Sequence, residues 1–203
     1  MKRFLLFTLS AFVLFSCTTE TDPIATKNSE PLNQDQRNYL MASVNNIGIY
    51  KGVFTTQDSE YRGVAEIQMV SADEIFSLTH ALPTAKIILT DGTVYEAKAA
   101  QVAQEGVAIA GMEFTSDQLS FTFSVAADGS NVQISNLHFQ QLDGGMLAAK
   151  HTNLAPVMPI TGTYVCTVCN GHPGLNGGQE QSWNILINEG TGDITSQVAF
   201  GGG

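Results

Sequence analysis

The sequence predicts a mainly β protein, an antiparallel meander that forms a β-sandwich or an open barrel, with one short helix near the N-terminus. Asp-Gly dipeptides separate apolar-rich runs at three places, Asp91-Gly92, Asp128-Gly129 and Asp143-Gly144, and this pattern is typical of β-hairpins. Between residues 119 and 125, apolar side chains alternate with serine or threonine. A period of two places one strand face in a core and the other in water.

The N-terminal segment has the composition of a secretory signal. Lys2 and Arg3 precede an apolar run at residues 4–13, and Leu14-Phe15-Ser16-Cys17 follows. The apolar run is too short for a membrane-spanning helix, which needs about 20 apolar residues. We therefore expect residues 1–16 to be a signal peptide that is removed.

The end of this segment resembles the lipobox of bacterial lipoproteins, in which a small residue, here Ser16, precedes a cysteine. The resemblance implies that Cys17 is diacylated on its sulfur and becomes the new N-terminus. Two or more acyl chains, such as palmitate, give a stable membrane anchor that a single chain would not. We expect a lipid-anchored protein of the bacterial cell envelope, at the outer membrane rather than the inner one.

Residues 17–46 are expected to form a lipidated tether and the short helix. The residues after Cys17 are polar and lack apolar periodicity, which is typical of a flexible linker. Within residues 29–44, Ser29 can cap a helix whose first turn contains Pro31. The folded part would therefore stand away from the membrane.

Residues 47–152 are expected to form a β-rich unit, with each Asp-Gly dipeptide in a hairpin turn. Two segments fit either a helix or a strand. Residues 71–82 combine capping-box spacing with apolar residues at helical intervals, and residues 96–104 are rich in alanine. A strand is favoured for both.

An apparent repeat follows this unit. The strand start Gly48-Ile49-Tyr50 is similar to Gly162-Thr163-Tyr164. A repeated supersecondary unit would explain the similarity, and coincidence is the alternative. Residues 153–161 would then be a linker, and residues 162–203 a partial second β unit or closing strands. Because a half-built sheet exposes an unpaired edge, the sequence could instead be a piece of a longer multi-unit protein.

The charge balance argues against a nucleic-acid partner. Removal of Lys2 and Arg3 leaves seven of the nine Lys and Arg residues against nineteen Asp and Glu, so the formal charge falls from −10 to −12. Phosphate binding requires clustered basic residues, and the chain lacks such clusters.

Cys166 and Cys169 remain once Cys17 is assigned to lipid, and an exported protein lies in a compartment where a disulfide persists. In a continuous strand, Cα atoms three residues apart are separated by about 10 Å, whereas a disulfide requires less than about 7 Å. A structural disulfide between these cysteines therefore requires a turn after the strand. The Asn-Gly-His-Pro-Gly run at 170–174 favours such a turn.

The same segment allows two reactive alternatives. A redox pair is one, although thioredoxin-like pairs begin a helix, and the glycine and proline after Cys169 oppose a helix. A metal site, with Cys166, Cys169 and His172 as ligands for zinc and His151 as a further candidate, is the other. No cofactor is expected outside the zinc alternative.

Aromatic residues offer a further kind of site. Trp183 and Tyr61 could stack on a sugar or an apolar side chain, but both could equally belong to a core. No nucleophile elbow, phosphate-binding loop or HExxH motif occurs.

The expected function is a noncatalytic binding or structural module attached to the membrane through its lipid. Its partner would be a protein, a glycan or a small apolar ligand. A barrel would favour an apolar ligand in its interior, and a sandwich would favour contact through loops. The alternative function is a metal-binding or redox protein centred on Cys166, Cys169 and His172.

Overall fold

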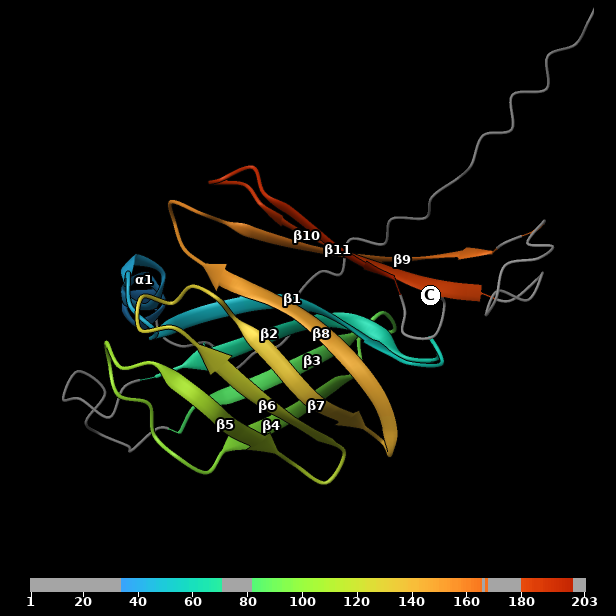
Figure 1. Ribbon diagram of the computed structural model, residues 1–203, viewed down its shortest axis with the longest axis horizontal. Helices are drawn as coiled ribbons and strands as arrows, with labels where there is room; N and C mark the ends of the chain where they lie inside the picture. The colour runs from blue at the N-terminus through green and yellow to red at the C-terminus, as the bar shows by residue number, and fades with distance from the viewer. Residues whose placement is uncertain (1–33, 71–81, 166, 168–179, 199–203) are drawn as a thin grey trace, which may run out of the picture.

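The computed structural model describes residues 34–70, 82–165, 167 and 180–198. Its described part contains an eight-stranded barrel, β1 to β8, with a separate three-stranded sheet, β9 to β11, packed against the outside of the barrel (Figure 1). The elements are α1 (Gln34–Ala42), β1 (Gly48–Thr56), β2 (Arg62–Met69), β3 (Thr84–Leu89), β4 (Val94–Ala99), β5 (Ile109–Thr115), β6 (Leu119–Val125), β7 (Gln133–Phe139), β8 (Leu142–His151), β9 (Val157–Val165), β10 (Glu180–Asn188) and β11 (Ile194–Val198).

The barrel is closed, whereas the sequence analysis expected a sandwich or an open barrel. Each strand pairs with the next in antiparallel order, and β8 returns to pair with β1. The closing register runs from Ile49 opposite His151 to Thr56 opposite Gly144. Closure removes the two free edges that an open sheet of the same strands would have. The mainly β fold class is confirmed.

The interior of the barrel is filled by aromatic side chains. Phe139 contacts Phe54, Tyr61 and Tyr95, at ring-centroid distances of 5.2, 5.1 and 4.7 Å. A second group joins Phe123 to Tyr50 (5.2 Å) and to Phe114 (6.2 Å), and Phe114 stacks on Phe121 at 4.9 Å. An eight-stranded barrel is just wide enough to be filled by its own side chains. In the described structure the barrel interior is therefore a packed core.

Two of the three predicted hairpin turns are confirmed, and the third is wrong. Asp91-Gly92 joins β3 to β4, and Asp128-Gly129 joins β6 to β7, with both glycines at positive φ. The β7–β8 hairpin turns instead at Gln140 and Gln141, whose φ angles are 49° and 72°. Asp143-Gly144 lies inside β8.

Gly144 serves close packing rather than a turn. A Cβ atom at this position would lie 2.6 Å from Leu137 Cδ2 and 2.9 Å from the carbonyl oxygen of Thr55. Only glycine leaves room for these neighbours at the point where β8 meets β1. A glycine next to aspartate can therefore mark a close approach between strands as well as a turn.

The second sheet begins earlier than expected. β9 starts at Val157, so the latter part of the predicted linker, residues 153–161, is strand. Pro159 lies in β9 and is aligned with Leu186 of β10. β9 is an outer strand in the order β11-β10-β9, and an edge strand tolerates proline because one side of its backbone needs no partner.

Helix α1 lies within the range expected for the N-terminal helix, and Met41 packs against the barrel core. Tyr50 is fully buried, and its hydroxyl donates to the carbonyl oxygen of Asn46 (2.9 Å). The expected strand at 96–104 is confirmed as far as Ala99. Residues 71–81, 1–33 and 199–203 lie outside the described residues. Within the described ranges, no helix is both long and apolar enough to cross a membrane.

Candidate binding surfaces

The inner face of the three-stranded sheet is partly polar. Side chains alternate along β10, and Ser182, Asn184 and Leu186 are buried where the sheet packs against the barrel strands β1, β2 and β8. Thr161 of β9 is aligned with Asn184 and is also buried. On the barrel side, Glu66 is among the buried outward-facing residues of β2.

Several polar atoms at this interface have no hydrogen-bond partner. Within the described residues, these are Ser182 Oγ and both polar atoms of the Asn184 side-chain amide; Nη1 of Arg62, at the start of β2, is also buried without a partner. A buried polar group without a partner costs about 1–3 kcal/mol. Two hydrogen bonds join the sheet to the barrel: the backbone N–H of Ser182 donates to Ser59 Oγ (3.2 Å), and the N–H of Val157 donates to His151 Nδ1 (2.9 Å).

The outer face of the same sheet is apolar. Cross-strand pairs place Ile185 beside Ile160, and Ile187 beside both Met158 and Ile194. Met158 is 44 % exposed and Ile194 is 68 % exposed, while the others are half-buried. We call this surface the outer apolar face, and it consists of Met158, Ile160, Tyr164, Trp183, Ile185, Ile187 and Ile194.

Trp183 lies flat on the outer apolar face. A Cβ atom at Gly162, its partner on β9, would lie 2.4 Å from Trp183 Cζ2, so the indole rests on bare backbone. The residue is half-buried. Tyr61, the second predicted stacking residue, packs instead against Phe139 in the barrel core. The two predicted stacking residues therefore belong to different parts of the molecule.

Acidic residues lie at both ends of the strand β10, next to the outer apolar face. Residues 153–203 contain no Lys or Arg, and their acidic residues are Glu180, Glu189 and Asp193. All three are exposed, Glu180 at the first residue of β10 and the other two at the β10–β11 turn. The charged residues at the two ends of β10 are therefore acidic.

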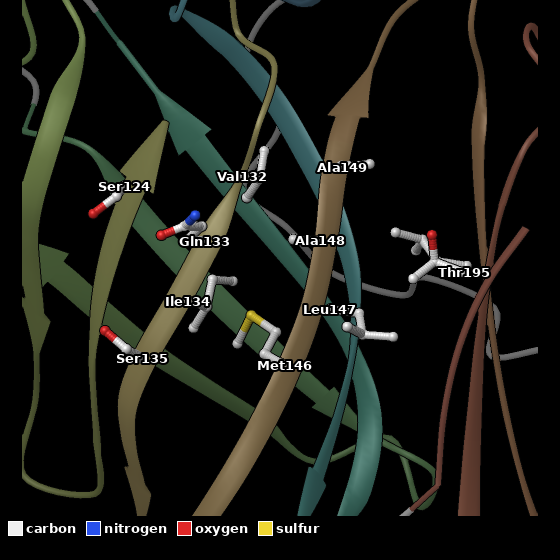
Figure 2. A pocket seen from close by; sticks show the side chains of 11 residues that line it. Ser124, Val132, Gln133, Ile134, Ser135, Met146, Leu147, Ala148, Ala149 and Thr195 are labelled. Carbon is white, nitrogen blue, oxygen red and sulfur yellow. The ribbon is translucent and has the colours of Figure 1, made fainter. Parts of the chain in front are cut away.

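A hollow lies between the barrel and the three-stranded sheet. It has a volume of about 510 Å³. Figure 2 shows Ile134 of β7 and Met146 of β8 in the space between these two strands, with Thr195 of β11 across from Leu147. We call this hollow the lateral slot, and its lining consists of Ser124, Val132, Gln133, Ile134, Ser135, Met146, Leu147, Ala148, Ala149, Leu186 and Thr195.

The barrel end nearest helix α1 holds a half-buried cation. Lys150 Nζ donates to the carbonyl oxygen of Asn45 and lies 3.4 Å from Ser43 Oγ. Burial lowers the pKa of Lys150 to about 8, against the opposing influence of the carboxylates of Asp128 and Glu105. Hydrogen bonds from Ser130 lower the pKa of Asp128. The polar atoms of Lys150 and its neighbours therefore interact with one another at this end of the barrel.

Cys17, Cys166, Cys169 and His172 lie outside the described residues, so the predicted anchor, disulfide and zinc site keep the status of predictions. His151 accepts a hydrogen bond from Val157 and thereby joins the barrel to β9. Among the residues that the structure describes, no three His, Cys, Asp or Glu side chains are grouped so as to hold a metal ion.

Sequence reasoning missed the outer apolar face and the lateral slot. The alternation of large apolar residues along β10 was a visible signal, but alternation alone predicts that those residues are buried. In the structure the residues between them, Ser182, Asn184 and Leu186, are the buried ones. No local pattern marks the lateral slot, since it depends on how the three-stranded sheet lies against β7 and β8.

The described fold is an up-and-down β-barrel with an accessory three-stranded sheet. No protein-family model, curated protein or solved structure matches the chain.

Proposed function

We propose that this chain is a lipid-anchored, noncatalytic binding protein of the bacterial cell envelope, and that it binds a protein partner through the outer apolar face. The anchor rests on the resemblance of Leu14-Phe15-Ser16-Cys17 to a lipobox. The binding role rests on one observation: the three-stranded sheet presents its more apolar face to solvent.

The size of the outer apolar face supports this role. A nine-residue strand spans about 30 Å, and three strands at a spacing of about 4.8 Å span about 14 Å. The face therefore covers roughly 400 Å², which is the scale at which an exposed apolar patch of a monomer is often functional. Burying such a face is what normally stabilises a sheet.

The charge around the face defines the partner. Glu180, Glu189 and Asp193 form an acidic rim, and complementary charge favours association of the correct partner. We therefore infer an apolar protein surface bordered by Lys or Arg. An anionic lipid surface would repel this rim, and a second copy of the chain would bring an equal acidic rim.

Site-specific photo-crosslinking in the native cells tests the proposal. A benzoylphenylalanine at Ile194, on the face, should crosslink to one protein, whereas the same residue at Val102 should not. Val102 is a matched control because it is 47 % exposed and lies in the loop after β4. Met158→Glu should abolish the adduct, because it places a charge within the apolar contact, beside Ile187.

The identity of the adduct decides the outcome. The crosslinked peptide of the partner should be apolar and flanked by Lys or Arg, and the purified partner should bind the protein at least tenfold more weakly after Met158→Glu. An adduct with a second copy of the chain, an adduct with lipid, or equal crosslinking from Val102 would overturn the proposed partner.

The anchor is tested separately by the intact mass of the protein purified from its own cells. Diacylglycerol and acyl mass on Cys17 is expected, with the protein in the membrane fraction, and Cys17→Ser should release it. An unmodified Cys17 would reject the anchor and leave the binding face untouched. Reduction and chelation of the same sample would show whether Cys166 and Cys169 form a disulfide or hold a metal with His172.

A further inference from the structure

The three-stranded sheet is open, so it has two outer strands. In the order β11-β10-β9, the strands β9 and β11 each have a neighbouring strand on one side only among the described residues. Peptide groups on the other side need hydrogen-bond partners, and an outer strand is therefore a template for pairing with another chain. The two outer strands differ in how this edge is protected.

The edge of β9 is partly blocked. Glu189 N–H donates to the carbonyl oxygen of Pro156 (2.8 Å), so residues 157 and 159 direct their peptide groups away from β10, because bonded and non-bonded pairs alternate along an antiparallel ladder. Val157 N–H already donates to His151 Nδ1 (2.9 Å), and Pro159 has no N–H. Neither of these positions therefore offers a donor to another strand.

The edge of β11 has no such protection. Its sequence, Ile-Thr-Ser-Gln-Val, contains no proline and no charged residue. Asn188 N–H donates to the carbonyl oxygen of Asp193 (2.9 Å) at the β10–β11 turn. By the same alternation, residues 195 and 197 bond to β10, whereas residues 194, 196 and 198 direct their N–H and C=O groups away from it. We call the peptide groups of these three residues the β11 edge.

We propose that an extended segment of the protein partner pairs with the β11 edge and extends the three-stranded sheet by one strand. This inference rests on the proposed function, because the added strand would continue the outer apolar face beyond Ile194. In such strand addition, main-chain hydrogen bonds provide the affinity, and side chains at alternate positions provide the specificity.

The surroundings of the β11 edge define the side chains of an antiparallel segment. The residue opposite Ile194 would share the outer apolar face, so it should be apolar. The residue opposite Thr195 would lie on the inner side of the sheet, next to the lateral slot (Figure 2). None of the residues that line this slot is charged, so an uncharged side chain is expected there.

Charge complementarity favours a different protein over a second copy of this chain. The residue that follows the antiparallel segment would lie beside Asp193, at the start of β11, and Glu189 is in the same turn. A Lys or Arg at that position would therefore pair with this acidic turn. A second copy of β11 could not supply one, since residues 153–203 contain no Lys or Arg.

Amide hydrogen exchange of the protein alone tests whether the β11 edge is free. The amides of residues 194, 196 and 198 should exchange at least tenfold faster than those of residues 195 and 197, which bond to β10. Equal protection of the two sets would mean that another part of the chain covers the β11 edge, and would overturn the proposal.

Photo-crosslinking in the native cells, from benzoylphenylalanine at Ile194, tests the pairing. Ser196→Pro removes an N–H from the β11 edge and leaves the bonds to β10 in place, so it should lower the adduct yield at least tenfold. Val165→Pro is the matched control and should leave the yield unchanged, because Val165 is 52 % exposed and its N–H belongs to the edge of β9. Continued protection of the amides at 184 and 186, which bond to β11, verifies that Ser196→Pro keeps the sheet.

Hydrogen exchange of the complex with the partner identified by the adduct gives a measurement that needs no variant. Binding should slow exchange at residues 194, 196 and 198 at least tenfold. Unchanged exchange there, or an adduct that Met158→Glu abolishes and Ser196→Pro leaves unchanged, would overturn the strand addition and keep the proposed function. The absence of any adduct from Ile194 would overturn the proposed function, and the strand addition with it.

Discussion

Two buried asparagines show how differently the barrel and the three-stranded sheet are built. Asn46, just before β1, is fully buried and makes three hydrogen bonds: its Nδ2 donates to the carbonyl oxygens of Gln104 (2.8 Å) and Val107 (2.9 Å), and its Oδ1 accepts from Gly106 N–H (2.7 Å). Asn184, on β10, is equally buried, and its side-chain amide has no hydrogen-bond partner within the described residues. The barrel thus satisfies the hydrogen bonds of its buried asparagine, whereas the sheet leaves those of Asn184 unsatisfied.

The apolar residues differ in the same way. The barrel encloses its aromatic rings, so Phe123 and Phe54 are fully buried. The sheet leaves Ile194 and Met158 in solvent and turns Ser182 and Asn184 inward. Under the proposed function, a partner that covers the outer apolar face would bury the apolar side chains that the sheet leaves in solvent.

The largest expected effect is on the barrel. Phe123→Ala removes a ring that contacts Tyr50 and Phe114 at the centre of the core, and such truncations cost about 3–5 kcal/mol of unfolding free energy. The matched change on the sheet, Trp183→Ala, should cost less than half as much, because that ring is already partly in solvent. Urea unfolding followed by circular dichroism measures both. Equal losses would show that the sheet is as much a core element as the barrel.

The sequence could predict the strands whose alternation and burial agree. Along β6, Leu119, Phe121, Phe123 and Val125 are buried and the residues between them are half-exposed, so local pattern and tertiary position coincide. Asp91-Gly92 and Asp128-Gly129 were predictable as turns because glycine readily takes positive φ.

Closure of the barrel and the orientation of the sheet were not predictable. Pairing of β1 with β8 joins residues about a hundred positions apart, and no local pattern encodes it. Along β10, Trp183, Ile185 and Ile187 have the alternation of a buried face, yet the residues between them are the buried ones. Which face of the sheet packs inward depends on the surface of the barrel that it meets. The need for glycine at position 144 likewise depends on residues distant in sequence, because Thr55 and Leu137 leave no room there for a side chain.

A pair of isosteric changes should move stability in opposite directions. Asn46→Leu leaves the carbonyl groups of Gln104 and Val107 and the Gly106 amide without their partner, so a loss of about 2–4 kcal/mol is expected. Asn184→Leu replaces an unsatisfied buried amide with an apolar group, which should raise the unfolding free energy by about 1 kcal/mol.

Asn188→Leu is the control for the second change. Asn188 also lies on β10, but its Oδ1 accepts hydrogen bonds from the amides of Gly190 (3.1 Å) and Thr191 (3.2 Å), so its replacement should destabilise the turn. Denaturant midpoints of the four proteins give the comparison. A loss of stability from Asn184→Leu would mean that its amide has a partner in solution, such as an ordered water, and that the sheet is docked as tightly as the barrel is closed.

The smallest expected effect concerns the cation of the barrel end. The pKa of Lys150 is lowered from 10.5 to about 8, chiefly because burial disfavours the charged amine. Between these values the unfolded chain binds a proton that the folded chain does not, so the unfolding free energy should rise as the pH increases from about 8 toward 10. Below about pH 8 both states bind the proton, and this residue adds no slope.

Lys150→Met should remove that rise while leaving the profile below pH 8 parallel to that of the wild type. Lys98→Met, which removes an exposed lysine of β4, should retain it. Urea midpoints at pH 7, 8.5 and 9.5 are sufficient, because the difference between variants cancels the tyrosines that titrate at higher pH. A rise that persists in Lys150→Met would assign the slope to another group. It would also mean that the Lys150 amine keeps its water, so that this end of the barrel is as incompletely sealed as the joint beneath the sheet.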